Sequence, residues 1–163
     1  MASQQTIVYQ MKIVVDTSVF MSALISPKGK CAELLLNPIF QMEKYTCYFL
    51  IVEVFKHKDK ILKCSKLTES ELLEQVYILM KNLTLINENQ ISPETWQNSF
   101  QLTEDVDTND TAFVALTEML DGKLWTLDNK LLNGLKQKGY NNIVTTKDIE
   151  TLSIQSNTSL ELG

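Results

Sequence analysis

Residues 12–20 read KIVVDTSVF, and this stretch decides the fold of the N-terminal part of the chain. The β-branched run at residues 12–15 predicts a short buried strand. Residues 16–18 are polar and break the strand, after which apolar residues recur at helical spacing over residues 19–24. A short apolar strand that enters a helix through a polar turn is typical of proteins built on a parallel sheet.

The same alternation of short strands and helices continues along the chain. Strands are predicted at residues 45–49, 84–86, 124–127 and 142–145, with helices between them. One of these helices is expected to begin at a capping box, and another at a serine followed by proline. The pattern predicts an α/β fold, a three-layer α/β/α sandwich around a mostly parallel central sheet.

The length of the chain fits one domain. Its 163 residues, 44% of them hydrophobic, suffice for one sizeable core. We assign residues 11–151 to this domain. Residues 1–10 are polar and precede a second methionine, Met11, so we expect an N-terminal extension or an alternative start. Residues 152–163 are polar and aperiodic, which predicts a flexible C-terminal tail.

The composition argues against secretion and membrane insertion. No stretch is long and apolar enough to span a bilayer, and the first ten residues lack the apolar core of a signal peptide. The three cysteines are odd in number and widely spaced, so we predict neither a disulfide framework nor a zinc quartet. A reducing cytoplasm is therefore the expected location.

The charge balance is acidic, and every basic residue is a lysine. The 20 acidic residues outnumber the 15 basic ones, which gives a formal net charge of −5 at pH 7. This excludes a generally basic nucleic-acid binder and any contact through a guanidinium group. Five lysines nevertheless gather between residues 56 and 66. Such a run is usually a solvated helix face, but it also offers a local contact for a phosphate backbone.

Acidic residues stand where the predicted strands end. Asp16 follows the first strand and Asp128 the fourth, while Asp107 and Asp110 begin the helix before that fourth strand. Glu53 lies one turn inside the helix after the second strand. Because parallel sheets bind ligands at the carboxyl ends of their strands, we expect these side chains to meet at one edge. Taken singly, each is also explained as a helix cap or a solvated residue.

The joint placement of the acids favours a metal site. Clustered carboxylates raise the pKa of one another unless a cation neutralises them. A set of oxygen ligands without histidine or cysteine suits Mg²⁺ or Mn²⁺, and both ions also bind substrate phosphate.

Four segments resemble, in order, the acidic motifs of the PIN domain family. They are IVVDTSVFMSAL (13–24), FLIVEVFKHKDKI (49–61), DVDTNDTAFVALTEML (105–120) and LWTLDNKLLNGLKQKGY (124–140). The resemblance spans residues 11–151 and implies a three-layer α/β nuclease fold that holds divalent metal on acidic residues. It also implies RNA as substrate, since many small bacterial members are RNA-cleaving toxins of toxin–antitoxin pairs. Ser18 stands where asparagine is common in the family.

By matching position, the resemblance implies Asp16, Glu53, Asp110 and Asp128 as the principal catalytic acids and Asp107 as an auxiliary acid. We expect the first, third and fourth of these to hold Mg²⁺ or Mn²⁺. We expect Glu53 to orient or deprotonate the attacking water.

Further residues are expected around these acids. Ser18 and Thr126 are predicted to donate hydrogen bonds within the site. Three lysines of the run, Lys56, Lys58 and Lys60, are predicted to contact RNA. Apolar patterns predict that Trp96 and Trp125 pack in the core.

These observations predict a metal-dependent endoribonuclease that hydrolyses RNA phosphodiester bonds, with an antitoxin and a second copy of the chain as candidate partners. One alternative is a phosphohydrolase that uses strand-end aspartates, although Thr17 and Ser18 do not supply the D-x-D pair such enzymes ordinarily carry. The other alternative is a non-catalytic metal-binding or interaction domain, which would bind metal without turnover. A covalent nucleophile is not predicted, because the single histidine, His57, belongs to the lysine run.

Overall fold

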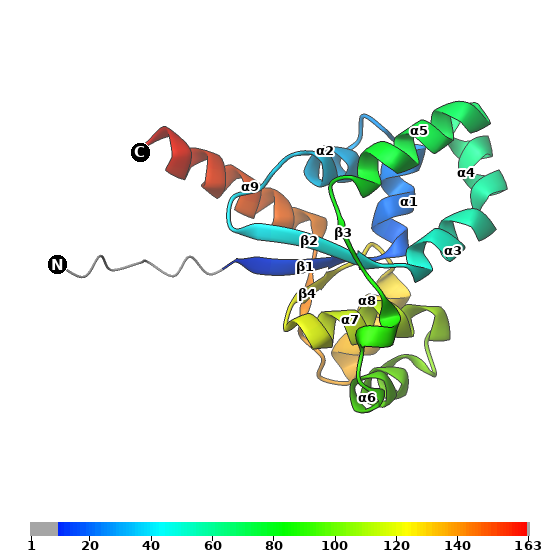
Figure 1. Ribbon diagram of the computed structural model, residues 1–163. Helices are drawn as coiled ribbons and strands as arrows, with labels where there is room; N and C mark the ends of the chain where they lie inside the picture. Colours follow the sequence, from blue (N-terminus) through cyan, green and yellow to red (C-terminus); the bar gives the residue numbers. More distant parts are fainter. Residues whose placement is uncertain (1–9, 163) are drawn as a thin grey trace.

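A five-stranded parallel sheet forms the centre of the protein (Figure 1). The computed structural model describes residues 10–162, so the expected extension at residues 1–10 lies almost wholly outside the described residues. The strand order is β3-β2-β1-β4-β5. The strands are β1 (Met11–Val15), β2 (Met42–Cys47), β3 (Thr84–Ile86), β4 (Lys123–Trp125) and β5 (Ile143–Val144).

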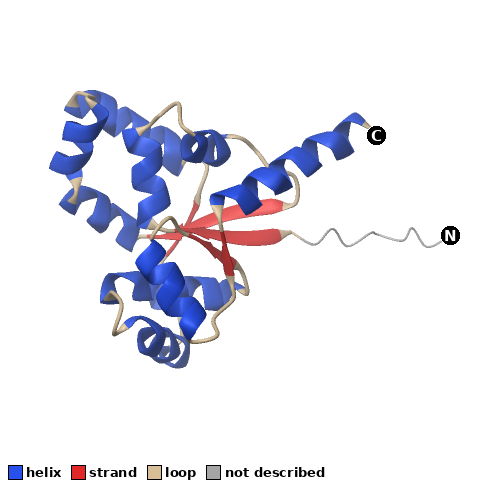
Figure 2. Ribbon diagram, turned by 180° about the vertical axis from the view of Figure 1, so that it is seen from behind, coloured by secondary structure: helices blue, strands red, loops and turns tan. Residues whose placement is uncertain are grey.

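Helices cover both faces of this sheet (Figure 2). One face carries α1 (Thr17–Ile25), α2 (Lys30–Leu36), α3 (Phe49–Lys56), α4 (Lys58–Ser65), α5 (Glu69–Met80) and α9 (Thr146–Glu161). The other face carries α6 (Pro93–Thr103), α7 (Thr111–Leu120) and α8 (Asn129–Gln137). Two short 3₁₀ helices, η1 (Glu88–Gln90) and η2 (Thr108–Asp110), precede α6 and α7 respectively. The predicted α/β/α sandwich is confirmed.

Strand β1 lies at the centre of the sheet and of the core. Val14 pairs with Tyr45 of β2 on one side and with Leu124 of β4 on the other. Ile13, Val14 and Val15 are fully buried. A strand covered on both faces reads as a continuous apolar run, which is why residues 12–15 are recognisable in the sequence. The neighbouring positions of β1 and β4 bring the residues that follow them to the same edge.

A close approach between β1 and the residue that precedes β4 requires a glycine. Asp121 ends α7 in the left-handed conformation, with φ of 50°, and Gly122 follows it. A Cβ atom on Gly122 would lie 2.6 Å from the carbonyl oxygen of Lys12. The missing side chain therefore allows β4 to pair with β1 in register.

Two predicted strands end two residues earlier in the structure. Strand β2 ends at Cys47, and Phe49 already belongs to α3, while β4 ends at Trp125. The spacing of Val52, Phe55, Ile61 and Leu62 also predicts one inward helical stripe, which is wrong in part because Phe55 is 77% exposed whereas Glu53 is buried. The acid thus occupies the inward face of α3, a position that hydrophobicity alone assigns to its apolar neighbours.

The two tryptophans differ in environment. Trp125 is fully buried, as predicted, and its indole N–H donates to Thr146 at 3.0 Å. Trp96 is 38% exposed, so its predicted place in the core is wrong. It lies in the first turn of α6, where only part of its ring is covered.

Residues 152–161, expected to lie in a flexible tail, belong to a helix. A capping box joins Thr145 and Asp148 at the start of α9, and Ile149 packs into the core. These contacts fix the first turns, and the helix continues through polar residues to Glu161. Within residues 10–162, no helix is long and apolar enough to cross a membrane.

Candidate active site

All five predicted acids line one cavity at the carboxyl ends of β1 and β4. Its volume is about 180 Å³. The lining residues come from five elements or their junctions: Asp16, Thr17, Ser18, Met21, Glu53, His57, Asp107, Asn109, Asp110 and Asp128. We call this the acidic cavity. The structure thus brings together carboxylates that lie up to 112 positions apart in the sequence.

Asp16 is the most deeply placed of these acids, with 2% of its surface exposed. Its Oδ1 accepts hydrogen bonds from the Ser18 hydroxyl at 2.6 Å and from the Val19 amide at 3.1 Å. The second bond caps α1, so the same carboxylate ends the strand and begins the helix. Burial raises the pKa of Asp16 from 3.8 to about 6, although the hydrogen bonds from Ser18 and Thr126 oppose this rise.

Ser18 and Thr126 connect the loops after β1 and β4. The hydroxyl of Ser18 accepts the Leu127 amide at 2.9 Å and lies 3.4 Å from the hydroxyl of Thr126. Thr126 in turn accepts the Asp128 amide at 3.0 Å. The two residues predicted to assist the site therefore hold Asp16 and Asp128 in fixed relation.

Asp128 caps the next helix. Its Oδ1 accepts the backbone amides of Lys130 at 2.9 Å and Leu131 at 3.2 Å. One carboxylate oxygen is thereby fixed by α8, and the side chain still lines the acidic cavity.

The loop that carries Asp107 and Asp110 is tied to the end of α6. The hydroxyls of Thr103 and Thr111 lie 2.6 Å apart in a buried hydrogen bond. The Asp107 amide donates to the Thr103 carbonyl at 3.0 Å, and the Asp107 carboxylate accepts the Asn109 amide at 2.9 Å. These bonds hold η2 beside the cavity.

Asp110 has an electrostatic environment that a cation would relieve. Its Oδ2 is buried and has no hydrogen-bond partner among the described residues. Burial, followed by the charges of Asp16, Asp107, Asp128 and Glu53, raises the pKa of Asp110 from 3.8 to about 7. A buried acceptor surrounded by like charges costs free energy unless a proton or a metal ion sits against it.

Glu53 faces the same cavity from α3 and is only 7% exposed. Its Oε1 accepts a hydrogen bond from Lys56 at 3.3 Å, and its Oε2 lies 3.7 Å from Nε2 of His57. The lysine one turn later on α3 therefore partly neutralises this carboxylate.

The three lysines predicted to contact RNA lie in different surroundings. Lys56 borders the acidic cavity through Glu53. Lys58 pairs with Glu69 at 2.5 Å on another surface, and Lys60 is exposed on α4. Only Lys56 of the three is in contact with a residue of the cavity.

The donor set fits Mg²⁺ or Mn²⁺ in its chemistry. In the described part of the chain, no three histidine, cysteine, aspartate or glutamate side chains form a ready-made cage around one point. The carboxylates instead line a cavity, and Asp110, which has one buried oxygen without a hydrogen-bond partner, lies close enough to four other acids for their charges to raise its pKa. Hard oxygen ligands with room for water are what these cations require.

Sequence reasoning missed two features of the site. It excluded His57, whereas the break between α3 and α4 turns this residue toward Glu53. It also gave no role to Thr103 and Thr111. The i, i+8 spacing of two threonines around an acidic loop is too common a pattern to reveal their hydrogen bond.

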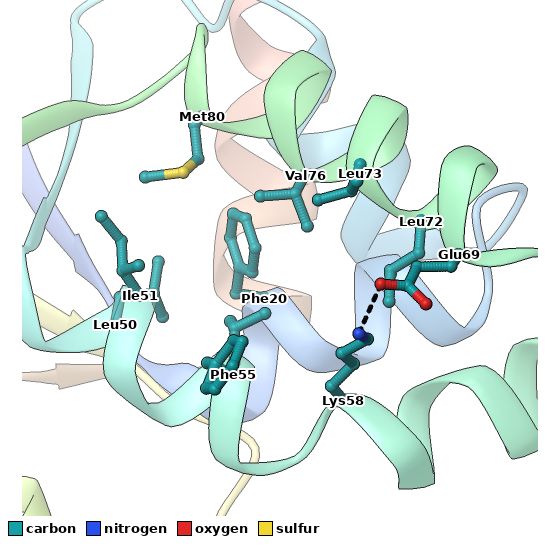
Figure 3. A pocket seen from close by; sticks show the side chains of 11 residues that line it. Phe20, Leu50, Ile51, Phe55, Lys58, Glu69, Leu72, Leu73, Val76 and Met80 are labelled. Carbon is teal, nitrogen blue, oxygen red and sulfur yellow. Dashed lines mark hydrogen bonds and ion pairs between the residues drawn. The ribbon is translucent and has the colours of Figure 1, made fainter.

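A second hollow, of about 210 Å³, lies on the other side of α3 (Figure 3). We call it the apolar groove. One wall is α3 with Ile51 and Phe55, the other is α5 with Leu73 and Val76, and Phe20 of α1 lies between them. Leu73 is 65% exposed, so the groove presents large apolar side chains to solvent.

The chain belongs to the PIN domain family, whose profile matches residues 14–155. No curated protein matches the chain.

Solved structures share the fold at low sequence identity. VapBC2 from Rickettsia felis, solved with a DNA fragment from its promoter, is 13% identical with a TM-score of 0.55, and the match covers 83% of this chain and 97% of that one. A toxin–antitoxin complex from Klebsiella pneumoniae is 17% identical with a TM-score of 0.55, over 82% and 97% of the two chains. PAE2754 from Pyrobaculum aerophilum is 13% identical with a TM-score of 0.55, over 93% and 98%.

Proposed function

We propose that this protein is a metal-dependent endoribonuclease and the toxin of a toxin–antitoxin pair. The observation that carries the proposal is the acidic cavity, which five carboxylates line and in which Oδ2 of Asp110 is buried without a hydrogen-bond partner. Such a cluster is unfavourable for stability and suits a cation that also binds phosphate. Membership of the PIN domain family and the fold shared with toxin–antitoxin proteins support the same function.

Hydrolysis of a phosphodiester forms one bond from a water oxygen to phosphorus and breaks the bond to the leaving oxygen. Glu53 would orient the water and accept its proton, because its buried carboxylate lines the acidic cavity and accepts a hydrogen bond from Lys56 at 3.3 Å. Asp16, Asp110 and Asp128 would hold Mg²⁺ or Mn²⁺. The ion would supply positive charge for the phosphoryl oxygens and lower the pKa of the attacking water. His57, 3.7 Å from Glu53, is placed to exchange the proton with solvent.

The test is cleavage of single-stranded RNA by the purified protein in Mg²⁺ or Mn²⁺. We expect activity that a chelator abolishes and that Asp16→Asn and Asp110→Asn each reduce at least a hundredfold. Asp59→Asn, an exposed acid on α4, serves as the matched control and should retain full activity. Undiminished cleavage by either cavity variant would refute the proposed site. Metal binding without turnover would favour an interaction domain.

The apolar groove is the proposed surface for the antitoxin. Its two walls each expose apolar side chains on one helix, Ile51 and Phe55 on α3 and Leu73 on α5. Two roughly facing helical walls fit the apolar face of an amphipathic helix. Lys58 and Glu69 border the groove, so a partner helix with charges of both signs along its edges would complement it.

This partner assignment is tested by co-expression with the product of the adjoining gene. We expect that protein to suppress RNA cleavage by the parent chain and to fail against Phe55→Asp. The variant itself should cleave RNA normally, because Phe55 lies on the face of α3 opposite Glu53. Equal suppression of cleavage by the parent and by Phe55→Asp would place the antitoxin outside the apolar groove. A second copy of the chain on the groove would appear as a dimer that Phe55→Asp dissociates.

A further inference from the structure

A third hollow, of about 260 Å³, lies beside the acidic cavity and exposes aromatic rings. It is lined by Tyr48, Phe49, Val52, Glu88, Trp96 and Ala112. We call it the aromatic hollow. Tyr48 is 48% exposed and Trp96 is 38% exposed, so both rings present surface to a ligand. Neither has been given a role in the proposed reaction.

The aromatic hollow and the acidic cavity share two walls. Helix α3 contributes Val52 to the hollow and the next residue, Glu53, to the cavity. Helix α7 begins between them, with Asp110 lining the cavity and Ala112 lining the hollow. A single-stranded RNA bound across the acidic cavity would therefore bring the next nucleotide to the aromatic hollow.

Lys56 lies at the boundary between the two. Its Nζ is 3.3 Å from Oε1 of Glu53 and 5.7 Å from the centre of the Phe49 ring. One ammonium group thus contacts a residue of each hollow. A phosphate that links a nucleotide at the acidic cavity to one at the aromatic hollow would meet this charge.

The hollow itself suits a neutral ring and not a phosphate. Glu88 lines it, and Oε1 of that carboxylate accepts the Phe49 amide at 2.5 Å. A carboxylate repels phosphate, but it accepts hydrogen bonds from the amino and imino groups of a base. Exposed aromatic rings stack on the bases of single-stranded nucleic acid, where those edges are free.

We infer that the aromatic hollow binds an unpaired nucleobase next to the scissile phosphate, an inference that rests on the proposed ribonuclease activity. Trp96 and Tyr48 supply the stacking surfaces, Glu88 accepts a hydrogen bond from the base, and Lys56 contacts the intervening phosphate. A partner helix is a poorer fit here, because the walls come from the start of α3, η1, α6 and α7 and form no pair of facing helices.

Binding is tested without turnover in Asp110→Asn, through the fluorescence of Trp96. Single-stranded RNA should quench the tryptophan emission, and the same sequence in a duplex should not. The quenching should be lost in the double variant Asp110→Asn with Trp96→Phe, since the remaining Trp125 is buried. Equal quenching by the duplex, or quenching that survives loss of Trp96, would overturn the inference.

Kinetics give a second readout in the active protein. We expect Trp96→Ala to raise KM for single-stranded RNA on the order of tenfold with little change in kcat, and Trp96→Phe to restore most of the affinity. Tyr77→Ala removes another exposed aromatic ring, on α5, and should leave KM unchanged. An unchanged KM in Trp96→Ala contradicts the inference. The inference is also contradicted if Trp96→Ala changes self-association of the protein, measured by gel filtration.

These outcomes are distinguishable from failure of the proposed function. If Asp16→Asn and Asp110→Asn leave cleavage intact, the acidic cavity is not the nuclease site, whatever RNA does to the fluorescence. If both variants abolish cleavage but RNA does not quench Trp96, the nuclease proposal stands and the base site is wrong.

Discussion

Asp110 and Asp16 are ionisable groups whose charged forms the fold disfavours. Burial raises the pKa of Asp16 to about 6, and burial together with four neighbouring carboxylates raises that of Asp110 to about 7. Both values lie above the ordinary 3.8, so the native state binds more protons than the unfolded state between about pH 4 and pH 7. The cation-free protein therefore loses stability as the pH rises through this window.

The loss of stability with rising pH predicts how the stability of Asp110→Asn depends on pH. The amide carries no charge, so the variant should be more stable than the parent at pH 8 and similar to it at pH 4, without added metal. The difference should grow by up to about 1.4 kcal/mol for each pH unit within the window. Urea unfolding at a series of pH values measures it. Asp59→Asn is the control for a general loss of negative charge, and equal gains in both variants would contradict the explanation.

Added Mg²⁺ should oppose the loss of stability that the cation-free protein suffers as the pH rises. A cation that binds only the native state stabilises it, so the midpoint of thermal unfolding at pH 8 should rise with Mg²⁺ concentration. Asp16→Asn should diminish this rise, because one of the proposed ligands is lost. A Mg²⁺ effect of the same size in the parent and the variant would place the cation outside the acidic cavity.

Ser18 is expected to tune Asp16. Its hydroxyl donates to Asp16 at 2.6 Å and accepts the Leu127 amide at 2.9 Å. Loss of the first bond in Ser18→Ala should raise the pKa of Asp16 further and shift the acid limb of the pH–rate profile to higher pH. We expect kcat/KM to fall about tenfold, as for other residues that orient metal ligands. Ser22→Ala, one turn later on α1, is the matched control and should leave the profile unmoved.

At the scale of the elements, strand ends were more predictable than helix faces. Asp16 and Asp128 could be placed together from the sequence, because neighbouring parallel strands end at the same edge. Glu53 could be expected at this edge from its place after β2 and from the family resemblance, but the hydrophobic pattern of α3 does not predict its burial, because Phe55 has the stronger hydrophobic signal. The inward position of the acid depends on the cavity that α3 helps to enclose, and the sequence of α3 alone does not contain that information.

The environments of Trp96 and of α9 also could not be predicted from their local sequences. An apolar pattern predicts burial of a tryptophan, but the extent depends on which elements pack over it, and α6 leaves part of this ring uncovered. Helix α9 has little apolar periodicity, and its start depends on the capping box at Thr145 and Asp148. Polar caps are short signals that a reading of hydrophobicity passes over.

Gly122 controls the register of β4 against β1. A methyl group at this position would lie 2.6 Å from the Lys12 carbonyl, so Gly122→Ala must displace one of the two segments. We expect a loss of about 1 to 3 kcal/mol in the free energy of unfolding. Cleavage should fall as well, because β4 leads to Asp128. Gly139→Asn is the control, since that glycine has open space around it and a left-handed φ of 78°, which asparagine tolerates. An unchanged stability in Gly122→Ala would contradict the steric argument.

For the whole molecule, charge is distributed unevenly. The net charge of −5 repels any polyanion at long range, whereas the lysines of α3 and α4 would favour the proposed RNA substrate locally. We expect RNA affinity to fall with salt, and Lys56→Gln to lower the slope of log K against log salt by about 0.7, the value for one phosphate contact on a single strand.

Lys58 provides the matched comparison for that prediction. It pairs with Glu69 at the apolar groove, so Lys58→Gln should change the salt slope less than Lys56→Gln does. Fluorescence anisotropy with a labelled oligonucleotide, at several salt concentrations, measures both. Equal changes in slope would indicate that the lysines act as a diffuse field and that Lys56 has no direct phosphate contact.

Helix α3 belongs to both proposed surfaces, with Glu53 toward the acidic cavity and Phe55 toward the apolar groove. Within a helix of eight residues, a displacement on one face moves the other. If a partner in the groove shifts α3 and changes the affinity of the cavity for a cation by some factor, the cation must change the affinity for that partner by the same factor. Divalent metal concentration would then regulate release of the proposed partner, and the proposed antitoxin and the metal ion would be thermodynamically linked through one helix.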